Sequence, residues 1–468
     1  MTRIDADHTR INTDTIRENQ RKNPHESALD SISVNQRVNQ RKSAIFMPFK
    51  KITLDNGLRI ILVPQEQSLA VTVLVLVEAG SKYETKEING LSHFLEHMCF
   101  KGTEKRPRSI DIASELAGIG AISNAFTSLE YTGYFAKSDP RHLHTILDVI
   151  SDVYLNPTFD PKEIDKERGV IIEERNMIID TPMRYIGDLW LNLLYGDEPA
   201  GLDVIGTKEN IQRLNRDDFI QYREKHYLSN STVVVVAGKF DEEDAVHKIK
   251  ESFSGVRDDR KTQKVKTIEN QTKPEILLKS KETDQTHLIL GVRAFDVFDE
   301  RKYALEVLSD ILGGGMSSRL FQKIRDGMGA AYYVFASDDL FSDHGYLAVQ
   351  AGVPEAKIDS VIHAILHEMR KIVNESVSDK ELARAKEHLV GTLMLGLETS
   401  SALAGFYGDQ EIIEKKIAAP EEYEKKIRAV TTEEIQSVAR DIFQNNKLNL
   451  AVIGPIKDKE RFEKILTL

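Results

Sequence analysis

The sequence predicts an α+β fold of two homologous domains, each a β-sheet covered by helices. At 468 residues the chain is too long for one ordinary hydrophobic core, so two domains of roughly 200 residues each are expected. Short apolar runs, such as Leu69 to Val77 and Ser231 to Gly238, alternate with helical patterns and are typical of buried strands. The two halves also resemble each other, which indicates an internal duplication.

The duplication is clearest in two segments that begin at Leu214 and Val430. Each segment contains a helical pattern, an Asn-containing turn, an apolar strand and a glycine. The first residues are 216 positions apart, and so are the glycines, Gly238 and Gly454. The match therefore needs no gap.

Polar segments predict the domain boundaries. Residues 1–46 mix charged residues, Asn and Gln with few bulky apolar residues, which is the composition of a disordered extension. Residues 257–273 carry charge without an apolar face and are predicted to be a linker. The two domains are therefore expected at residues 47–256 and 274–468.

Composition excludes several classes of protein. A formal net charge of -11 and a pI near 5.7 argue against a nucleic-acid binder, which needs an excess of Lys and Arg. The longest apolar runs are shorter than the roughly 20 residues that cross a bilayer, so no membrane span is expected. The single cysteine, Cys99, allows no intrachain disulfide, and the N-terminal residues lack the pattern of a secretory signal. These features together predict a cytoplasmic protein.

The stretch LSHFLEHMCFKG, from Leu91 to Gly102, predicts a metal site. On a helix, positions i, i+3 and i+4 share one face, so His93, Glu96 and His97 lie together. Two imidazoles one turn apart can hold one metal ion, and the glutamate is then free to take a proton from a metal-bound water. The alternative is three polar residues on a solvated face, but the apolar neighbours indicate a buried helix, where unpaired His and Glu would be costly.

A third protein ligand is expected in FDPKEIDKERGVIIEERNMI. This segment opens like a helix, with Asp160 as N-cap and a proline in the first turn. Glu167 and Glu174 interrupt an apolar stripe formed by Val170, Ile171, Met177 and Ile178. Glu173 instead shares a polar face that needs no explanation. Glu174 is therefore the ligand candidate.

These motifs carry a resemblance to a known family. GLSHFLEHMCFKGT, ISNAFTSLEYTGYFAK and KERGVIIEERNM, in that order, resemble the pitrilysin-type inverzincin zinc metallopeptidases, especially the branch of mitochondrial processing peptidase and its bacterial relatives. The resemblance covers the chain from about Met47 to its end. It implies an endopeptidase with one zinc ion, a two-domain clamshell half, and a homodimer or related heterodimer.

The resemblance also implies roles for individual residues. Zinc would be held by His93, His97 and Glu174, with Glu96 as general base and Glu167 orienting a ligand. The first strand of ISNAFTSLEYTGYFAK would take up an extended peptide along its edge, through Ser123, Asn124, Ala125, Phe126 and Thr127. Without the resemblance, this segment is better explained as a half-buried strand. Expected substrates are unfolded peptides or presequence-like segments, and the acidic balance favours basic ones.

The second half lacks a metal site, because Val307, Asp310 and Ile311 occupy the positions of the zinc motif. In the family, a pair matching Arg325 and Tyr332 reaches the substrate backbone and the developing oxyanion. A surface Arg and a core Tyr are the alternative, and nearby glycines favour a strand and turn for this segment. Two rival functions remain: a non-catalytic subunit, and a partner-dependent subunit of a heterodimer.

Overall fold

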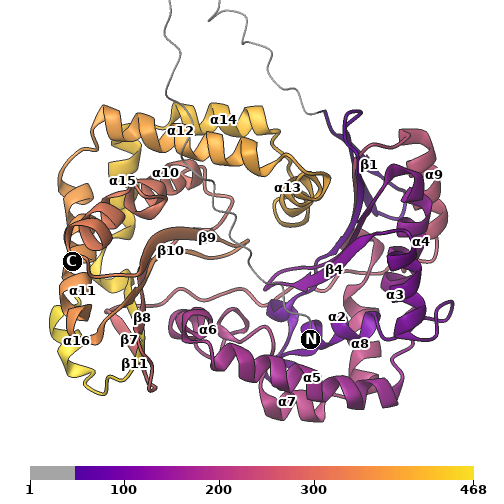
Figure 1. The fold of residues 1–468 in the computed structure, drawn as a ribbon, viewed down its shortest axis with the longest axis horizontal. Coiled ribbons are helices and arrows are strands. Elements are labelled where there is room, and N and C mark those ends of the chain that lie inside the picture. Colours follow the sequence, from indigo (N-terminus) through magenta and orange to yellow (C-terminus); the bar gives the residue numbers. More distant parts are fainter. Residues whose placement is uncertain (1–47) are drawn as a thin grey trace, which may run out of the picture. The chain divides into compact units, whose positions relative to one another are not determined.

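The computed structural model describes residues 48–468, so the predicted extension of residues 1–46 lies outside the described part of the chain. The described residues form two β-sheets (Figure 1). The first sheet has the strand order β1-β2-β6-β3-β5-β4, and the second has the order β7-β11-β8-β10-β9. The strands are β1 Lys50–Thr53, β2 Arg59–Pro64, β3 Val71–Val77, β4 Ile122–Thr127, β5 Thr132–Ser138, β6 Thr232–Gly238, β7 Glu275–Ser280, β8 Thr286–Ala294, β9 Tyr333–Leu340, β10 Gly345–Val353 and β11 Leu448–Gly454.

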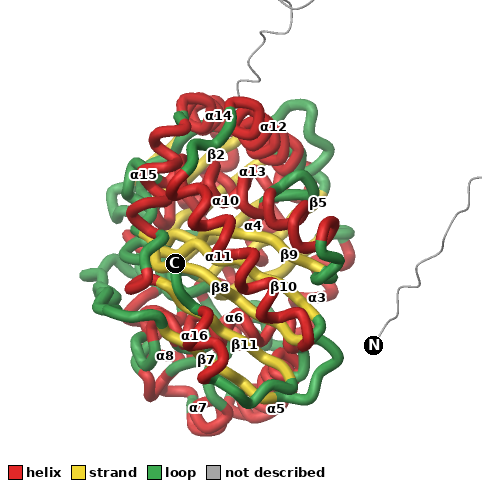
Figure 2. Tube along the Cα trace, turned by 90° about the vertical axis from the view of Figure 1, so that its left-hand side faces the viewer, coloured by secondary structure: helices red, strands yellow, loops and turns green. Residues whose placement is uncertain are grey.

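Helices cover both sheets, which confirms the predicted α+β class. In the first half they are α2 Leu91–Cys99, α3 Ser109–Gly118, α4 Leu143–Leu155, α5 Pro161–Ile179, α6 Pro182–Tyr195, α7 Lys208–Arg213, α8 Arg216–His226 and α9 Glu242–Ser252. In the second half they are α10 Lys302–Gly313, α11 Ile358–Asn374, α12 Asp379–Gly396, α13 Ser400–Ile413, α14 Pro420–Ala429, α15 Thr432–Ile442 and α16 Glu460–Ile465. Figure 2 views the second sheet with α10 and α11 in front of it.

The two central apolar runs form the middle of the first sheet. Strands β3 and β6 consist largely of valine, and every residue in both strands is buried. They pair antiparallel, with Val71 opposite Gly238. β-Branched residues suit a pleated strand, and a continuous apolar run indicates that both faces of the sheet are covered.

The duplicated segments have the same structure. In the first half, α8 leads through a short 3-10 turn into β6, and in the second half α15 leads through a similar turn into β11. Both helices start with a capping box, at Asn215 and Thr431, which are again 216 positions apart. The repeated helix, turn and strand support the interpretation of two homologous halves.

Each half contributes a helix to the other half's sheet. Helix α13, from the second half, packs on β3 and β6 of the first sheet, where Leu403 and Ala404 meet Val233 and Val235 (Figure 1). It can lie this close because Gly408 has no side chain: a Cβ there would be 2.7 Å from a methyl group of Leu76. The face of the first sheet that is turned toward the second half is thus buried by a segment more than 150 residues away in sequence (Figure 1).

The reciprocal contact is made by α6 of the first half, which packs on the second sheet. Trp190 and Leu194 join a buried cluster with Ile289, Ala451 and Ile453. The Trp190 ring meets Tyr346 edge to face, with centroids 5.7 Å apart. Two of the buried apolar clusters therefore contain residues from both halves. The domain boundaries at residues 256 and 274 stay predictions.

The predicted linker, residues 257–273, contains no helix or strand. It runs past the tips of two hairpins and is held there by polar contacts. Lys264 pairs with Glu130 in the β4–β5 turn, and the Thr267 amide donates to Asp343 in the β9–β10 turn at 2.9 Å. Through the linker, the hairpin that carries β4 is connected to the second sheet.

No single helix of residues 48–468 has both the length and the apolar character needed to cross a membrane. The pair α12 and α13, bent by 116°, meets these criteria only when the two helices are taken together.

Candidate active site

Helix α2, which carries the HxxEH motif, is anchored at its N-terminus by a buried glutamate. Glu84 accepts hydrogen bonds from the amides of Gly90 at 2.8 Å and Ser92 at 2.5 Å. These bonds satisfy donors that have no partner within the helix. Burial raises the pKa of Glu84 to about 7, even though these hydrogen bonds lower it. Gly90 has a φ of 97°, and a Cβ there would lie 2.7 Å from the Ile205 carbonyl oxygen, so this position requires glycine.

The rest of α2 is packed as the motif predicts. Leu91, Phe94, Leu95 and Met98 are each no more than 1% exposed. His93 and His97 are partly exposed on the remaining face, and their ring centroids are 4.7 Å apart. The buried-helix interpretation is therefore confirmed.

Glu174 on α5 lies opposite the two histidines. One ligand atom from each of His93, His97 and Glu174 lies within 4.8 Å of the others. The Glu174 Oε2 atom is 3.8 Å from His93 Nε2 and 3.6 Å from His97 Nε2. Ligand atoms around a tetrahedral zinc ion are separated by about 3.4 Å when each bond is about 2.1 Å, so two imidazoles and one carboxylate in this arrangement fit zinc.

Glu173, the neighbour of Glu174, is exposed, as the helical-face argument predicts. The predicted apolar stripe around Glu174 is only partly buried. Ile171 is fully buried, but Val170 and Met177, one turn on either side of Glu174, are more than half exposed. Because this face of α5 is not packed against another element along its whole length, the Glu174 carboxylate remains accessible.

Glu167, two turns before Glu174, contacts the candidate ligand His97 at the ring nitrogen that does not face Glu174. Its Oε1 atom is 2.8 Å from Nδ1 of His97, and its Oε2 atom pairs with Lys101. Burial opposes ionisation of Glu167, but the hydrogen bonds from His97 and Lys101 outweigh it and lower the pKa of the carboxyl. With Nδ1 engaged by a carboxylate, the Nε2 atom of His97 is left to face Glu174.

Glu96 is placed differently from the three candidate ligands. It is 9% exposed, and Oγ1 of Thr127 donates a hydrogen bond to its Oε2 atom at 2.6 Å. Burial raises the pKa of Glu96, and the Thr127 hydrogen bond partly offsets this effect. A carboxylate with a raised pKa beside a metal site is suited to accept a proton.

Strand β4, the predicted substrate strand, forms an open edge of the first sheet. It pairs with β5 on one side, and no described strand pairs with its other side. Ser123, Asn124 and Phe126 are exposed, whereas Ala125 and Thr127 are half-buried. The free backbone groups of β4 end at Thr127, next to Glu96.

Arg325 and Tyr332 lie in the second half, and neither side chain forms a hydrogen bond, ion pair or ring contact with the described residues of the zinc motif. Arg325 is exposed in a π-helix, Phe321–Gly327, where its guanidinium lies 4.9 Å from the Phe321 ring. The predicted strand and turn is therefore wrong for Arg325, because the chain stays helical up to Gly327. Tyr332 precedes β9 and is 74% exposed, which excludes the alternative of a core tyrosine.

Several polar residues near the site were not predicted from the sequence. Asp188 on α6 and Asp203 are partly buried, and no residue of the described part of the chain forms a hydrogen bond or an ion pair with either carboxylate. Burial and the charge of Asp203 raise the pKa of Asp188 to about 7, while the nearby Arg175 lowers it. The Asp203 backbone carbonyl accepts from Asn89, just before α2, at 2.9 Å. Single acidic residues on two separate segments gave no signal of this convergence in the sequence.

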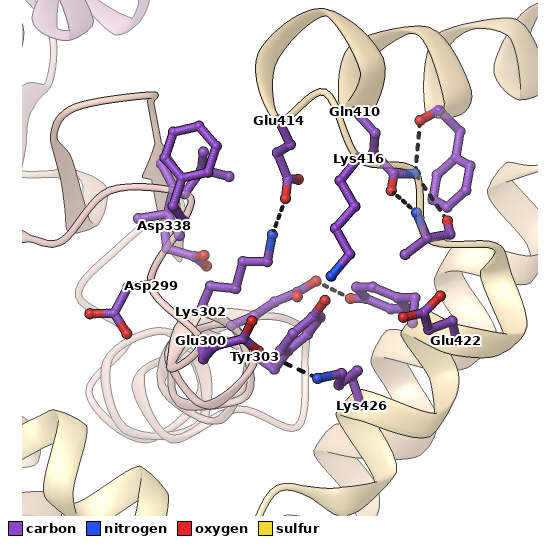
Figure 3. A pocket seen from close by; sticks show the side chains of 17 residues that line it. Asp299, Glu300, Lys302, Tyr303, Asp338, Gln410, Glu414, Lys416, Glu422 and Lys426 are labelled. Atoms are coloured by element: carbon purple, nitrogen blue, oxygen red, sulfur yellow. Dashed lines mark hydrogen bonds and ion pairs between the residues drawn. The ribbon is translucent and has the colours of Figure 1, made fainter. Parts of the chain in front are cut away.

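A separate cavity of about 350 Å³ lies between α10, β9, α13 and α14 (Figure 3). Its polar groups are largely paired with one another. Lys302 pairs with Glu414 at 2.6 Å, and the Tyr423 hydroxyl donates to Glu306. None of the candidate catalytic residues lines this cavity, so it is not the site that the motif predicts.

Two family models match the chain, one in each half. Residues 59–208 match the family described as Insulinase (Peptidase family M16), and residues 213–389 match the family described as Peptidase M16 inactive domain. The uncharacterized zinc protease YmxG of Bacillus subtilis is 35% identical over 87% of this chain and 98% of its own length. The uncharacterized zinc protease SCO5738 of Streptomyces coelicolor is 34% identical over 88% of this chain and 90% of its own.

Solved structures show the same fold. A protease from Helicobacter pylori superposes with a TM-score of 0.81 at 22% identity, covering 87% of this chain and 99% of that one. An M16-like peptidase from Alicyclobacillus acidocaldarius gives a TM-score of 0.77 at 20% identity, covering 87% and 98%. The resemblance to pitrilysin-type peptidases is thereby confirmed. This chain belongs to peptidase family M16, and its bacterial relatives are named zinc proteases.

Proposed function

We propose that the chain is a zinc-dependent endopeptidase of the HxxEH type that hydrolyses extended peptides. The observation that carries this proposal is that ligand atoms of His93, His97 and Glu174 lie within 4.8 Å of one another. The carboxylate of Glu96 lies on α2, the helix that also carries the two histidines. These three residues would hold one zinc ion per chain. When bound, zinc makes a water molecule more acidic and polarises the carbonyl group of the substrate.

Glu96 is the general base in this proposal. Its Oε2 atom is engaged by Thr127, and no described residue makes a hydrogen bond to Oε1. Oε1 is therefore available to accept a proton from the attacking water and to pass it to the leaving amine. Glu167 orients His97 through Nδ1, and Lys101 holds the second oxygen of Glu167.

Substrates are proposed to be unfolded or presequence-like peptides. A peptide that pairs with the open edge of β4 uses backbone hydrogen bonds along Ser123 to Thr127, which requires an extended chain but no particular sequence. The carboxyl groups of Asp188 and Asp203 interact with each other, and Asp203 lies close to the start of α2. A basic peptide side chain beside this pair would favour its ionised form, in agreement with a preference for basic peptides.

The second half is proposed to contribute Arg325 and Tyr332 to the substrate backbone and the developing oxyanion. Support comes from the family resemblance and from the exposure of both side chains. We retain residues 47–256 as the catalytic domain, residues 257–273 as the linker and residues 274–468 as the homologous domain without zinc. A homodimer or related heterodimer and a cytoplasmic location complete the proposal.

The alternative is a non-catalytic or partner-dependent subunit of a processing-peptidase-like heterodimer. The complete set of candidate ligands and base on this one chain favours the self-sufficient enzyme. If the purified, zinc-loaded chain cleaves peptides only after a related subunit is added, the alternative is correct.

The test measures zinc and turnover on the same preparations. Glu96→Gln should keep about one zinc ion per chain, measured by elemental analysis, but should lower the cleavage of a quenched-peptide library by at least about a hundredfold. Glu174→Gln should lose both zinc and activity, because it removes a ligand charge. Glu173→Gln, at the exposed neighbouring position, is the control and should keep both. Zinc loss in Glu96→Gln equal to that in Glu174→Gln would mean that Glu96 is a ligand.

A further inference from the structure

The proposed general base touches the proposed substrate strand through one side chain. Thr127 is the last residue of β4, and its hydroxyl donates to Glu96 at 2.6 Å. The two residues are 31 positions apart, and their side chains are half-buried and buried, respectively. No other side-chain hydrogen bond to Glu96 is recorded among residues 48–468.

This hydrogen bond restricts a flexible side chain. A glutamate has three rotatable bonds, and a hydroxyl-to-carboxylate bond of this length is among the stronger hydrogen bonds in proteins. Because the hydroxyl occupies Oε2, the carboxylate is held with Oε1 free. The contact thus selects which oxygen is available to a proton.

The position of the Thr127 hydroxyl depends on the end of β4. On its inner side this end is fixed by pairing with β5, where Thr127 lies opposite Thr132, and the Thr132 hydroxyl donates to the Ala79 carbonyl at 2.7 Å. On its outer side the strand has no described partner. A peptide bound to that edge would supply the second row of backbone hydrogen bonds.

We propose that Thr127 is a positioning residue that couples occupancy of the β4 edge to the orientation of Glu96. Pairing of the peptide fixes the end of β4, the Thr127 hydroxyl is fixed with it, and Glu96 is held in the rotamer that accepts the proton. The inference rests on the proposed function of Glu96 and goes beyond it, because it assigns to Thr127 a side-chain role that backbone pairing alone does not require.

The experiment compares two substitutions at Thr127 in the full-length, zinc-loaded chain. Thr127→Val keeps the shape and the strand preference of threonine but removes the hydroxyl. It should lower kcat for an extended quenched peptide by about tenfold to a hundredfold, the range for a misplaced catalytic group, with KM within about twofold of wild type. Thr127→Ser keeps a hydroxyl and should recover kcat to within about threefold of wild type. Zinc content should be unchanged in both variants.

Thr72→Val is the matched control on β3 of the same sheet, because the Thr72 hydroxyl bonds to that of Ser400 and contacts neither Glu96 nor Thr127. It should lower the melting temperature with little change in kcat. The inference is overturned if Thr127→Val retains wild-type kcat, if its defect lies in KM alone, or if Thr127→Ser is as impaired as Thr127→Val. If the wild-type chain binds zinc but cleaves no peptide, the proposed function itself is wrong. If the wild-type chain is active and Thr127→Val is equally active, the proposed function stands and only the role of Thr127 is wrong.

Discussion

Replacing Leu403 by alanine tests whether the two halves unfold as one cooperative unit. Such cooperativity is expected because α13 packs on the first sheet and α6 packs on the second sheet. Leu403 lies on α13 and is 3% exposed, in the buried apolar cluster between α13 and the first sheet. Losing about three buried methylene equivalents costs roughly 2.4 kcal/mol, and the cavity left behind raises the expected loss to about 3–4 kcal/mol. A loss of this size is a large fraction of the stability of a typical protein.

The chain contains an internal reporter for this experiment. Trp190 is the only tryptophan in the sequence, and it is buried where α6 packs on the second sheet, far in sequence from Leu403. Urea unfolding is followed by Trp190 fluorescence and by far-ultraviolet circular dichroism. If the cores are shared, Leu403→Ala should shift both transitions to lower urea by the same amount.

The control is Leu395→Ala, the same substitution at a position on α12 that is 71% exposed. It should change the free energy of unfolding by less than about 0.5 kcal/mol. The reasoning is refuted if Leu403→Ala leaves the fluorescence transition in place while the circular dichroism transition splits in two. That result would mean that the first sheet unfolds without the second, despite α13.

Three further predictions concern the site and the surrounding fold. Tyr332→Phe should lower kcat by about tenfold to a thousandfold with zinc intact, the range for losing one oxyanion donor, whereas Arg325→Ala should mainly raise KM; unchanged kinetics in both would remove these residues from the mechanism. Burial lowers the pKa of His226 to about 4, below its value of about 6.5 in the unfolded chain. Between these two pH values the unfolded chain binds a proton that the folded chain does not. The free energy of unfolding should therefore fall as the pH drops from about 6.5 to about 4. His226→Phe should remove up to about 3 kcal/mol of this pH dependence, and equal acid sensitivity of the variant in thermal melts would contradict it. Chelation should abolish peptide cleavage, and added zinc should restore it; activity that persists in metal-free protein would exclude zinc catalysis.

Local patterns in the sequence predict the elements that form the site. The spacing of His93, Glu96 and His97 depends only on helical geometry, and the face of Glu174 is distinguishable from that of Glu173 for the same reason. The duplicated helix, turn and strand are likewise local, since each unit lies within one continuous segment, from Leu214 to Gly238 and from Val430 to Gly454. These features could therefore be predicted without knowledge of tertiary structure.

Contacts between distant segments could not be predicted in this way. The apolar residues of α13 and the amphipathic pattern of α6 indicate that these helices are packed but not which sheet each one covers. The bonds of Glu96 with Thr127 and of Glu167 with Lys101 join residues that are 31 and 66 positions apart. Their partners are ordinary polar residues, which occur at many surface positions, so the sequence gives no reason to single them out.

Helix α6, which packs on the second sheet, also connects the second half to the candidate metal site, although none of the three candidate ligands lies in that half. Helix α5, which carries Glu174, ends at Ile179, and α6 begins three residues later at Pro182. The Lys281 side chain, just after β7, donates to the Ile179 carbonyl at 2.6 Å, and Gln350 on β10 donates to the Met183 carbonyl at 3.1 Å. The end of α5 is therefore fixed to the second sheet, both by these bonds and by the packing of α6. Because Glu174 lies on the same helix as this fixed end, the second half helps to hold the helix that supplies the third candidate ligand.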